Sequence, residues 1–267
     1  VALLDQLTHG RVNWGAGRGF DATEHKAFGV APEDSYPKFR ESVEVVLKAW
    51  QDGPFTHKGK FYEFENIEVL PKPYQKDIPV WVAAGSESSI EWAAEKGLSI
   101  LRAPRFTSID TVEEQWDLYS ELMRTAGHDP MAFDQPLLMQ TYVAEDDATA
   151  KAEAEEHAMW YHDLFQKVLP GAPDQPVHPG YEVYDTIRKA HARVGYDDLS
   201  NWGSAFGDPD TVAQRVLTYA RKGGTNHWMA EMRFGGLSHD QTMRSMRLFA
   251  EEVMPRVRDD LAKDAAA

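Results

Sequence analysis

The chain has 267 residues, and 42% of them are hydrophobic, which is enough apolar material for a full-sized core. Its 43 Asp and Glu against 28 Lys and Arg give a formal net charge of −15. So acidic a surface repels phosphate backbones and anionic lipid, which excludes nucleic acid and membranes as partners. Cysteine is absent, which excludes disulfides and thiolate chemistry and favours a cytoplasmic location.

Short apolar runs alternate with amphipathic helical patterns, which is typical of repeated βα units around a parallel sheet. Strands are predicted at residues 12–17, 80–84, 98–101, 137–143 and 226–232. Helices are predicted at about residues 34–52, 86–97, 110–126, 146–169, 187–194, 210–222 and 240–257. Two segments depart from the alternation: an excursion at about 53–79, which contains a hairpin, and a proline-rich, loop-rich insertion at about 170–205.

The whole chain, residues 1–267, is expected to form one domain, because no linker or shift of composition divides it. A (β/α)8 TIM barrel closes with eight strands in roughly 250 residues. Five strands would instead leave an open sheet with two bare edges. The expected fold is therefore the C-terminal part of an α/β TIM barrel, strands four to eight, with about three βα units absent before Val1.

Glycines surround an arginine where the first predicted strand ends, in Gly15-Ala16-Gly17-Arg18-Gly19. Glycine lets a backbone approach a ligand closely, and an arginine fork suits a phosphate or a carboxylate. The spacing is not that of a dinucleotide fingerprint. Phosphate binding and a simple tight turn both remain open here.

A second candidate follows the strand at 80–84, where Gly85 and Ser86 to Ser89 open a helix. The start of a helix exposes unpaired amide groups and the positive end of its dipole, so it can bind an anion. Ordinary N-capping by a serine is the alternative. Both candidates lie at carboxyl ends of strands, where parallel barrels bind their substrates.

The remaining candidate groups are less distinctive. The ten histidines show no metal-binding spacing, so no metal is expected. Glu24 and His25 could act as acid and base, and Glu231 could pair with Arg233 or meet a ligand.

Three aromatic residues stand in or near strand ends and could line a substrate pocket. They are Phe106, Trp202 and Trp228. Core packing is the alternative for each of them.

Several motifs together resemble the bacterial luciferase-like flavin-dependent monooxygenases, and the luciferase α-subunit in particular. The matching stretches are Leu3 to Arg11, Gly15 with Arg18 and Gly19, Phe28-Gly29, Val82 to Leu101, Gly127-His128-Asp129, Gly207 with Pro209, and Met246 to Pro255. They span nearly the whole chain.

The resemblance implies a (β/α)8 barrel that binds reduced FMN, reacts it with O2 to a C4a-peroxyflavin, and oxygenates a small organic substrate. It also implies a separate NAD(P)H:flavin reductase as a partner and a homodimer. By matching position, Arg18 would hold the FMN phosphate, and the amides around Ser86 with the Ser89 hydroxyl would complete the cradle. Gly85 would pass under the ribityl chain.

Two positions depart from the luciferase pattern. Gly17, beside the expected flavin, stands where luciferase α-subunits carry a reactive cysteine, and Gly85 stands where they carry an acidic residue. The catalytic histidine of the family is expected upstream of Val1, so no catalytic residue is assigned.

Three alternative functions stay open. They are an F420-dependent oxidoreductase that transfers hydride, a non-catalytic flavin-binding subunit, and a barrel enzyme without flavin, since a fold does not determine a function.

Overall fold

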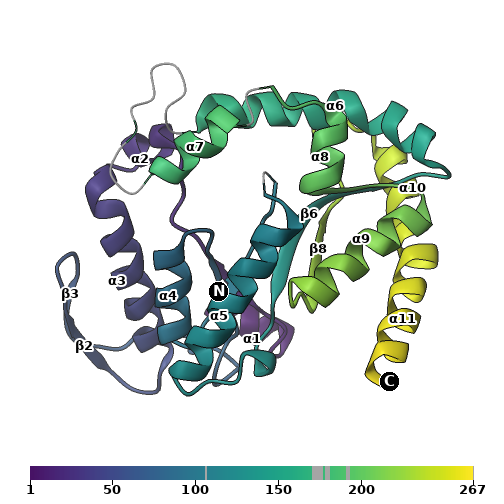
Figure 1. Ribbon diagram of the computed structural model, residues 1–267. Helices are drawn as coiled ribbons and strands as arrows, with labels where there is room; N and C mark the ends of the chain where they lie inside the picture. The colour runs from purple at the N-terminus through teal and green to yellow at the C-terminus, as the bar shows by residue number, and fades with distance from the viewer. Residues whose placement is uncertain (106, 170–176, 178–180, 191–192, 267) are drawn as a thin grey trace. The chain divides into compact units, whose positions relative to one another are not determined.

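The computed structural model describes residues 1–105, 107–169, 177, 181–190 and 193–266 (Figure 1). It divides into two compact units. Unit 1 comprises residues 1–83 and 168–186, and unit 2 comprises residues 84–167 and 187–267. Strands and helices alternate in both units, as the sequence pattern predicts, so the fold is of the α/β class.

Unit 1 contains two parallel strands, β1 (Trp14–Ala16) and β4 (Val80–Ala83), which pair from Trp14 opposite Val80 to Ala16 opposite Val82. Its helices are α1 (Ala2–Thr8), α2 (Ala22–Ala27) and α3 (Pro32–Trp50). Pro32 stands in the first turn of α3, where its missing N–H costs no hydrogen bond. Trp50 at the end of α3 packs edge-on against Trp14, with ring centroids 5.0 Å apart, and so ties this helix to β1.

The excursion in unit 1 is an antiparallel hairpin of β2 (Phe55–Lys58) and β3 (Glu63–Ile67). The carboxylate of Glu41, from α3, accepts hydrogen bonds from the backbone N–H groups of Lys60, Phe61 and Tyr62, at 3.0, 3.1 and 2.8 Å. A side chain at Gly59 would begin 2.0 Å from this carboxylate, which explains the glycine in the turn. One carboxylate therefore fixes the hairpin to α3.

Unit 2 contains four strands: β5 (Ser99–Leu101), β6 (Pro136–Val143), β7 (Ser204–Gly207) and β8 (His227–Glu231). β6 is central and pairs in parallel with β7 along Gln140–Val143 and with β8 along Pro136–Gln140. An isolated parallel bridge joins Leu137 to Arg102, just after β5.

The apolar pattern predicts five strands outside the hairpin, whereas the described residues contain six. The strand that was not predicted is β7. β7 is only four residues long and begins at the end of the predicted insertion, of which residues 170–176, 178–180 and 191–192 are outside the described residues. The rest of this segment contains α7 (Glu182–Ala190) and α8 (Tyr196–Trp202), so much of it is helical.

The remaining helices of unit 2 are α4 (Glu87–Glu95), α5 (Ile109–Thr125), α6 (Asp147–Val168), α9 (Pro209–Lys222), α10 (His239–Leu248) and α11 (Met254–Ala266). A 3-10 turn at Pro130–Ala132 precedes β6. A π-helical turn at Phe249–Val253 joins α10 to α11, so the last helical stretch extends beyond the predicted end at residue 257. None of the described helices has the length and apolarity needed to cross a bilayer.

The two faces of β6 pack into separate cores, because successive side chains of a strand point to opposite faces. Leu137, Met139 and Val143 join a cluster with the inner side of α9. Tyr142 joins the other cluster, with Phe206 of β7 and a column of fully buried alanines on α6. The alanines let α6 approach the sheet closely.

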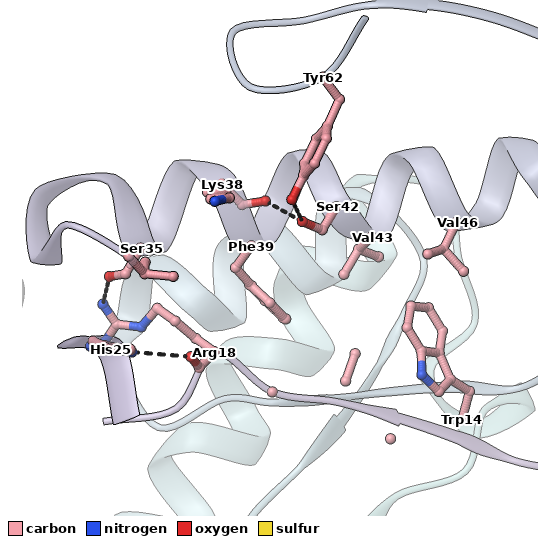
Figure 2. Close-up of a pocket in the computed structure, with 14 residues that line it drawn as sticks. Trp14, Arg18, His25, Ser35, Lys38, Phe39, Ser42, Val43, Val46 and Tyr62 are labelled. Atoms are coloured by element: carbon pink, nitrogen blue, oxygen red, sulfur yellow. Dashed lines mark hydrogen bonds between the residues drawn. The ribbon is translucent and has the colours of Figure 1, made fainter. Parts of the chain in front are cut away.

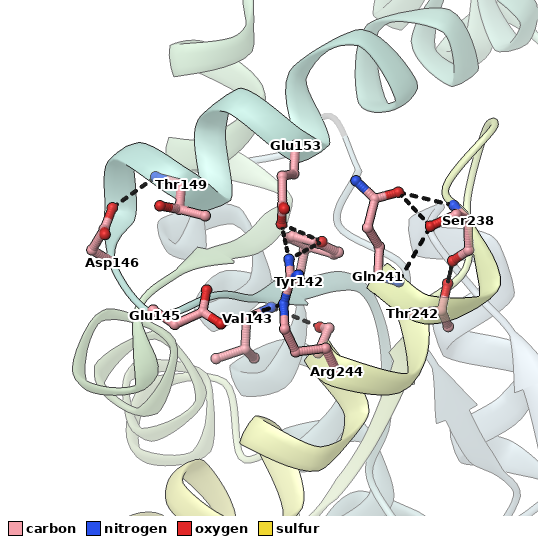
Figure 3. A network of polar contacts seen from close by, with 11 residues as sticks. Tyr142, Val143, Glu145, Asp146, Thr149, Glu153, Ser238, Gln241, Thr242 and Arg244 are labelled. Atoms are coloured by element: carbon pink, nitrogen blue, oxygen red, sulfur yellow. Dashed lines mark hydrogen bonds and ion pairs between the residues drawn. The ribbon is translucent and has the colours of Figure 1, made fainter.

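A polar network anchors α6 and α10 to the end of β6 (Figure 3). The Tyr142 hydroxyl donates to Glu153 at 2.7 Å, and Arg244 forms an ion pair with the same carboxylate and lies 3.5 Å from Glu145. Burial, together with the Glu153 carboxylate, raises the pKa of Tyr142. Burial acts to raise the pKa of Glu153, but the hydrogen bonds from Tyr142 and Arg244 outweigh it and lower that pKa. At neutral pH the network therefore consists of a neutral phenol, a carboxylate and a guanidinium.

Candidate functional site

A cavity of about 420 Å³ opens in unit 1 beside the end of β1 and helix α3 (Figure 2). Phe39, Val43 and Val46 of α3 form its apolar wall, since their spacing places them on one side of the helix. Polar side chains, including Arg18 and Ser35, line its other end. The cavity thus combines an apolar wall with a cationic end.

Arg18 follows β1 by two residues, and aromatic rings hold its guanidinium. The central guanidinium carbon lies 4.2 Å from the ring centroid of Tyr181 and 5.3 Å from that of Tyr36. Its Nη1 donates to the Ser35 hydroxyl at 3.4 Å. No carboxylate of the described residues forms an ion pair with Arg18, so its charge is available to an anion.

A cycle of hydrogen bonds closes around Arg18. The Tyr181 hydroxyl lies 2.8 Å from the Ser35 hydroxyl and 3.3 Å from Nδ1 of His25, whose Nε2 lies 3.4 Å from the carbonyl oxygen of Arg18. His25 is buried, and these contacts account for both of its ring nitrogens. His25 therefore supports Arg18, and acid–base chemistry by Glu24 and His25 stays a prediction.

Gly17 and Gly15 leave space beside β1. A side chain at Gly17 would meet only the Ala83 methyl group, at 3.8 Å, and one at Gly15 would meet no atom within 4 Å. Gly19 differs, because its φ of +78° belongs to the left-handed region that favours glycine. Only Gly19 is therefore required by the local backbone.

Ser86, Ser89 and Gly85 lie together in unit 2, where α4 begins. Ser86 occupies the N-cap position, yet its hydroxyl makes no capping hydrogen bond; it lies 2.9 Å from the Ser89 hydroxyl. The Gly85 carbonyl accepts a hydrogen bond from Gln115 at 3.2 Å. The pair of hydroxyls thus stands at the positive end of the helix dipole, although Glu87 places a carboxylate in the same first turn.

A different ion pair from the predicted one forms at the end of β8. Arg105 donates to Glu231 at 2.7 Å, and its guanidinium lies 4.7 Å from the ring centroid of Tyr161 on α6. Burial raises the pKa of that tyrosine. The expected pairing of Glu231 with Arg233 is wrong, because Arg105, 126 positions away in sequence, reaches the carboxylate and Arg233 is exposed.

The three aromatic candidates have different surroundings. Phe106 lies outside the described residues. Trp228 packs edge-on against Tyr219 of α9, with ring centroids 6.2 Å apart, and lies against the hydrophobic cluster between α9 and β6. This arrangement agrees with core packing, the alternative to a pocket role. Trp202 ends α8, and its carbonyl accepts a hydrogen bond from Tyr219 at 2.6 Å.

Histidines and acidic side chains form no metal-binding group within the described residues. His162 is buried on α6, and His157 accepts a hydrogen bond from the backbone N–H of Gly236. The predicted helix around His191 ends, in the described residues, at Ala190.

Sequence reasoning missed Ser35 and Tyr181. Tyr181 is 146 positions from Ser35 in sequence and belongs to no recognisable motif, so only the fold reveals their contact. Ser35 lies in the first turn of α3, where serine is a common residue and so indicates no ligand site.

A family model described as luciferase-like monooxygenase matches residues 1–226. The alkanal monooxygenase alpha chain of Aliivibrio fischeri is 24% identical over 265 residues, which cover 97% of this chain and 74% of that protein. The oxygenase component of a flavin-dependent trigonelline monooxygenase from Acinetobacter baylyi is 25% identical over 253 residues, covering 81% and 69%.

Solved structures show the same fold. Monooxygenase RslO1 from Streptomyces bottropensis has a TM-score of 0.74 at 25% identity, covering 95% of this chain and 71% of its own. The oxygenating constituent of 3,6-diketocamphane monooxygenase from Pseudomonas putida, in complex with FMN, has a TM-score of 0.73 at 20% identity, and the match covers 96% of this chain and 74% of that one. The F420-dependent tetrahydromethanopterin reductase of Methanopyrus kandleri has a TM-score of 0.68 at 19% identity, and the match covers 96% of this chain and 77% of that one.

Proposed function

This chain belongs to the luciferase-like monooxygenase family of oxidoreductases, and we propose that it is a monooxygenase that uses reduced FMN and O2 to oxygenate a small organic substrate. We further propose that its parallel strands are those of a (β/α)8 barrel. The family model and the structural neighbours support both statements.

The observation that carries the cofactor proposal is the charge of Arg18, which lines the cavity and forms no ion pair with a carboxylate of the described residues. A guanidinium of this kind suits a phosphate group. Arg18 thus fits the phosphate of FMN, with Gly17 leaving space beside it.

Ser86, Ser89 and Gly85 of unit 2 are proposed as further residues that bind the cofactor. The uncapped start of α4 offers backbone N–H groups and two hydroxyls to an anion. The backbone at Gly85 has no atom within 4 Å of where a side chain would begin, so a ligand chain can pass close to it.

When bound, reduced FMN would supply the reaction with O2. The chain would bind the phosphate through Arg18 and orient the cofactor, and its apolar wall of Phe39, Val43 and Val46 would keep water away. The substrate is proposed to be a small organic molecule. We propose that the chain forms a homodimer and that a separate NAD(P)H:flavin reductase supplies its reduced flavin. The similarity to an oxygenase component of a flavin-dependent monooxygenase supports the separate reductase.

A hydride-transferring F420 enzyme is the second candidate, because an F420-dependent reductase shares the fold. Titration with oxidised FMN and with F420 separates the two. The monooxygenase proposal expects saturable FMN binding and O2 consumption with reduced FMN. Saturable binding of F420 alone, with turnover that needs no O2, would replace it with the F420 assignment, and FMN binding without substrate oxidation would favour a non-catalytic subunit.

A further inference from the structure

Tyr181 contacts Arg18 from a distant part of the chain. Its side chain is 2% exposed, and its ring centroid lies 4.2 Å from the guanidinium carbon of Arg18. It precedes α7, whereas Arg18 follows β1, and the two share unit 1. The ring of this buried tyrosine contacts a cation and its hydroxyl contacts two polar groups, so its role goes beyond filling space in the core.

Each hydroxyl near Arg18 has one proton, which limits the directions of the hydrogen bonds. The Ser35 hydroxyl donates to the Pro32 carbonyl at 2.8 Å and accepts from Nη1–H of Arg18, so the Tyr181 hydroxyl donates to Ser35 and accepts from Nδ1–H of His25. Nε2 of His25 lies 3.4 Å from the Arg18 carbonyl oxygen, so His25 also contacts the backbone of Arg18. The cycle therefore fixes the backbone and the side chain of Arg18 at the same time.

We infer that Tyr181 is a positioning residue for the anion-binding Arg18, which makes the site select a phosphorylated flavin over an unphosphorylated one. The inference rests on the proposed FMN function. The ring of Tyr181 holds the guanidinium plane, and its hydroxyl links Ser35 to His25, so Arg18 loses less rotamer freedom when it binds a phosphate. We expect the effect at the phosphate end, because the contacts of Tyr181 that carry the inference are with Arg18, Ser35 and His25.

Binding of FMN and of riboflavin by flavin fluorescence tests the inference, since the two ligands differ only by the phosphate. Tyr181→Leu removes both ring and hydroxyl, and we expect FMN to bind about 10-fold more weakly while riboflavin affinity stays within about 2-fold. Tyr181→Phe keeps the ring, and we expect a loss of about 3-fold for FMN. Tyr74→Leu is the control in the same unit, because Tyr74 is 58% exposed and packs edge-on against His9, just after α1.

A double variant separates positioning from a general structural role. In an Arg18→Ala background, Tyr181→Leu should leave FMN affinity unchanged within about 2-fold, because the residue acts through Arg18. Equal weakening of FMN and riboflavin, or an undiminished loss in the Arg18→Ala background, would overturn the inference. Tyr181→Phe covers the case in which Tyr181→Leu does not fold.

The outcomes also separate this inference from the proposed function. A wild-type protein that binds FMN, with affinity that Tyr181→Leu does not change, refutes the inference alone. A wild-type protein that shows no saturable FMN binding refutes the proposed function, and the inference falls with it.

Discussion

Arg102 is a buried cation without a counter-charge, and its replacement by methionine should stabilise the protein. Its side chain is 2% exposed, follows β5, and has no carboxylate within ion-pair distance among the described residues. One nitrogen donates to the Val112 carbonyl at 3.3 Å, while Nε and Nη2 have no hydrogen-bond partner. The Trp116 ring lies 6.0 Å from the guanidinium carbon. Arg102→Met keeps an unbranched, flexible side chain and removes the charge.

The expected gain follows from the cost of burying the charge. Burial lowers the pKa of Arg102 to about 10, and the nearby Tyr119 only partly opposes this. A fall of this size from the ordinary arginine value corresponds to about 3 kcal/mol, because one pKa unit is worth about 1.4 kcal/mol. The lost hydrogen bond and cation–π contact offset about 1–2 kcal/mol. The net prediction is that Arg102→Met raises the free energy of unfolding by about 1–2 kcal/mol.

Urea unfolding at pH 7 measures the difference, and thermal unfolding should show a rise of the midpoint by about 2–8 °C. The group is basic and its folded pKa is lowered, so the cost is full below about pH 10 and declines only above it. The gain should therefore be the same at pH 6 and pH 8. Arg124→Met is the control, because Arg124 is exposed on α5. A loss of stability in Arg102→Met would refute the reasoning and show that the buried charge is compensated.

Two further predictions concern Glu41 and the glycines after β1. Burial acts to raise the pKa of Glu41, but hydrogen bonds from His57 and the hairpin amides outweigh it and lower that pKa. The contribution of Glu41 to folding stability is therefore full above about pH 4.5 and is lost as the pH falls through the lowered pKa. Protection of the β2–β3 turn amides from exchange, relative to the intrinsic rate at each pH, should therefore fall below about pH 4.5 in the wild type, and an identical acid response in Glu41→Gln would contradict this. Gly17→Ala should change the free energy of unfolding by less than about 0.5 kcal/mol, whereas Gly19→Ala should lose about 1 kcal/mol because its φ is +78°. Equal losses in both, measured by urea unfolding, would contradict the glycine assignment.

The fold was predictable wherever a strong period marked an element. The helices around Val43, Val112 and Val212 and the strand at Leu137 to Val143 follow from apolar spacing, and their structural bounds differ by at most two residues. Short elements were missed, namely α1, α2, α8 and β7, because four to seven residues carry too little periodicity. Tertiary pairing with β6 makes Ser204–Gly207 a strand, and no local pattern expresses it.

The candidate site was predictable at its ligand-facing positions and not in its supports. Arg18 and Ser86 stand at chain positions with a local signature, glycines after a strand and serines before a helix. Their partners come from elsewhere: Tyr181 supports Arg18, and Arg105 takes the carboxylate of Glu231 that local alternation had assigned to Arg233. Such long-range contacts depend on how the chain folds back, which residue spacing alone does not encode.

The central claim, that Arg18 binds the phosphate of FMN, is tested most directly by titrating FMN and riboflavin into Arg18→Ala. Arg11→Ala is the matched control, because Arg11 is exposed and its one side-chain hydrogen bond within the described residues goes to the Thr8 carbonyl. A charge-assisted contact worth about 1.5–3 kcal/mol predicts FMN binding about 10- to 100-fold weaker in Arg18→Ala, with riboflavin affinity unchanged. FMN affinity equal to that of the wild type and of Arg11→Ala would contradict the account.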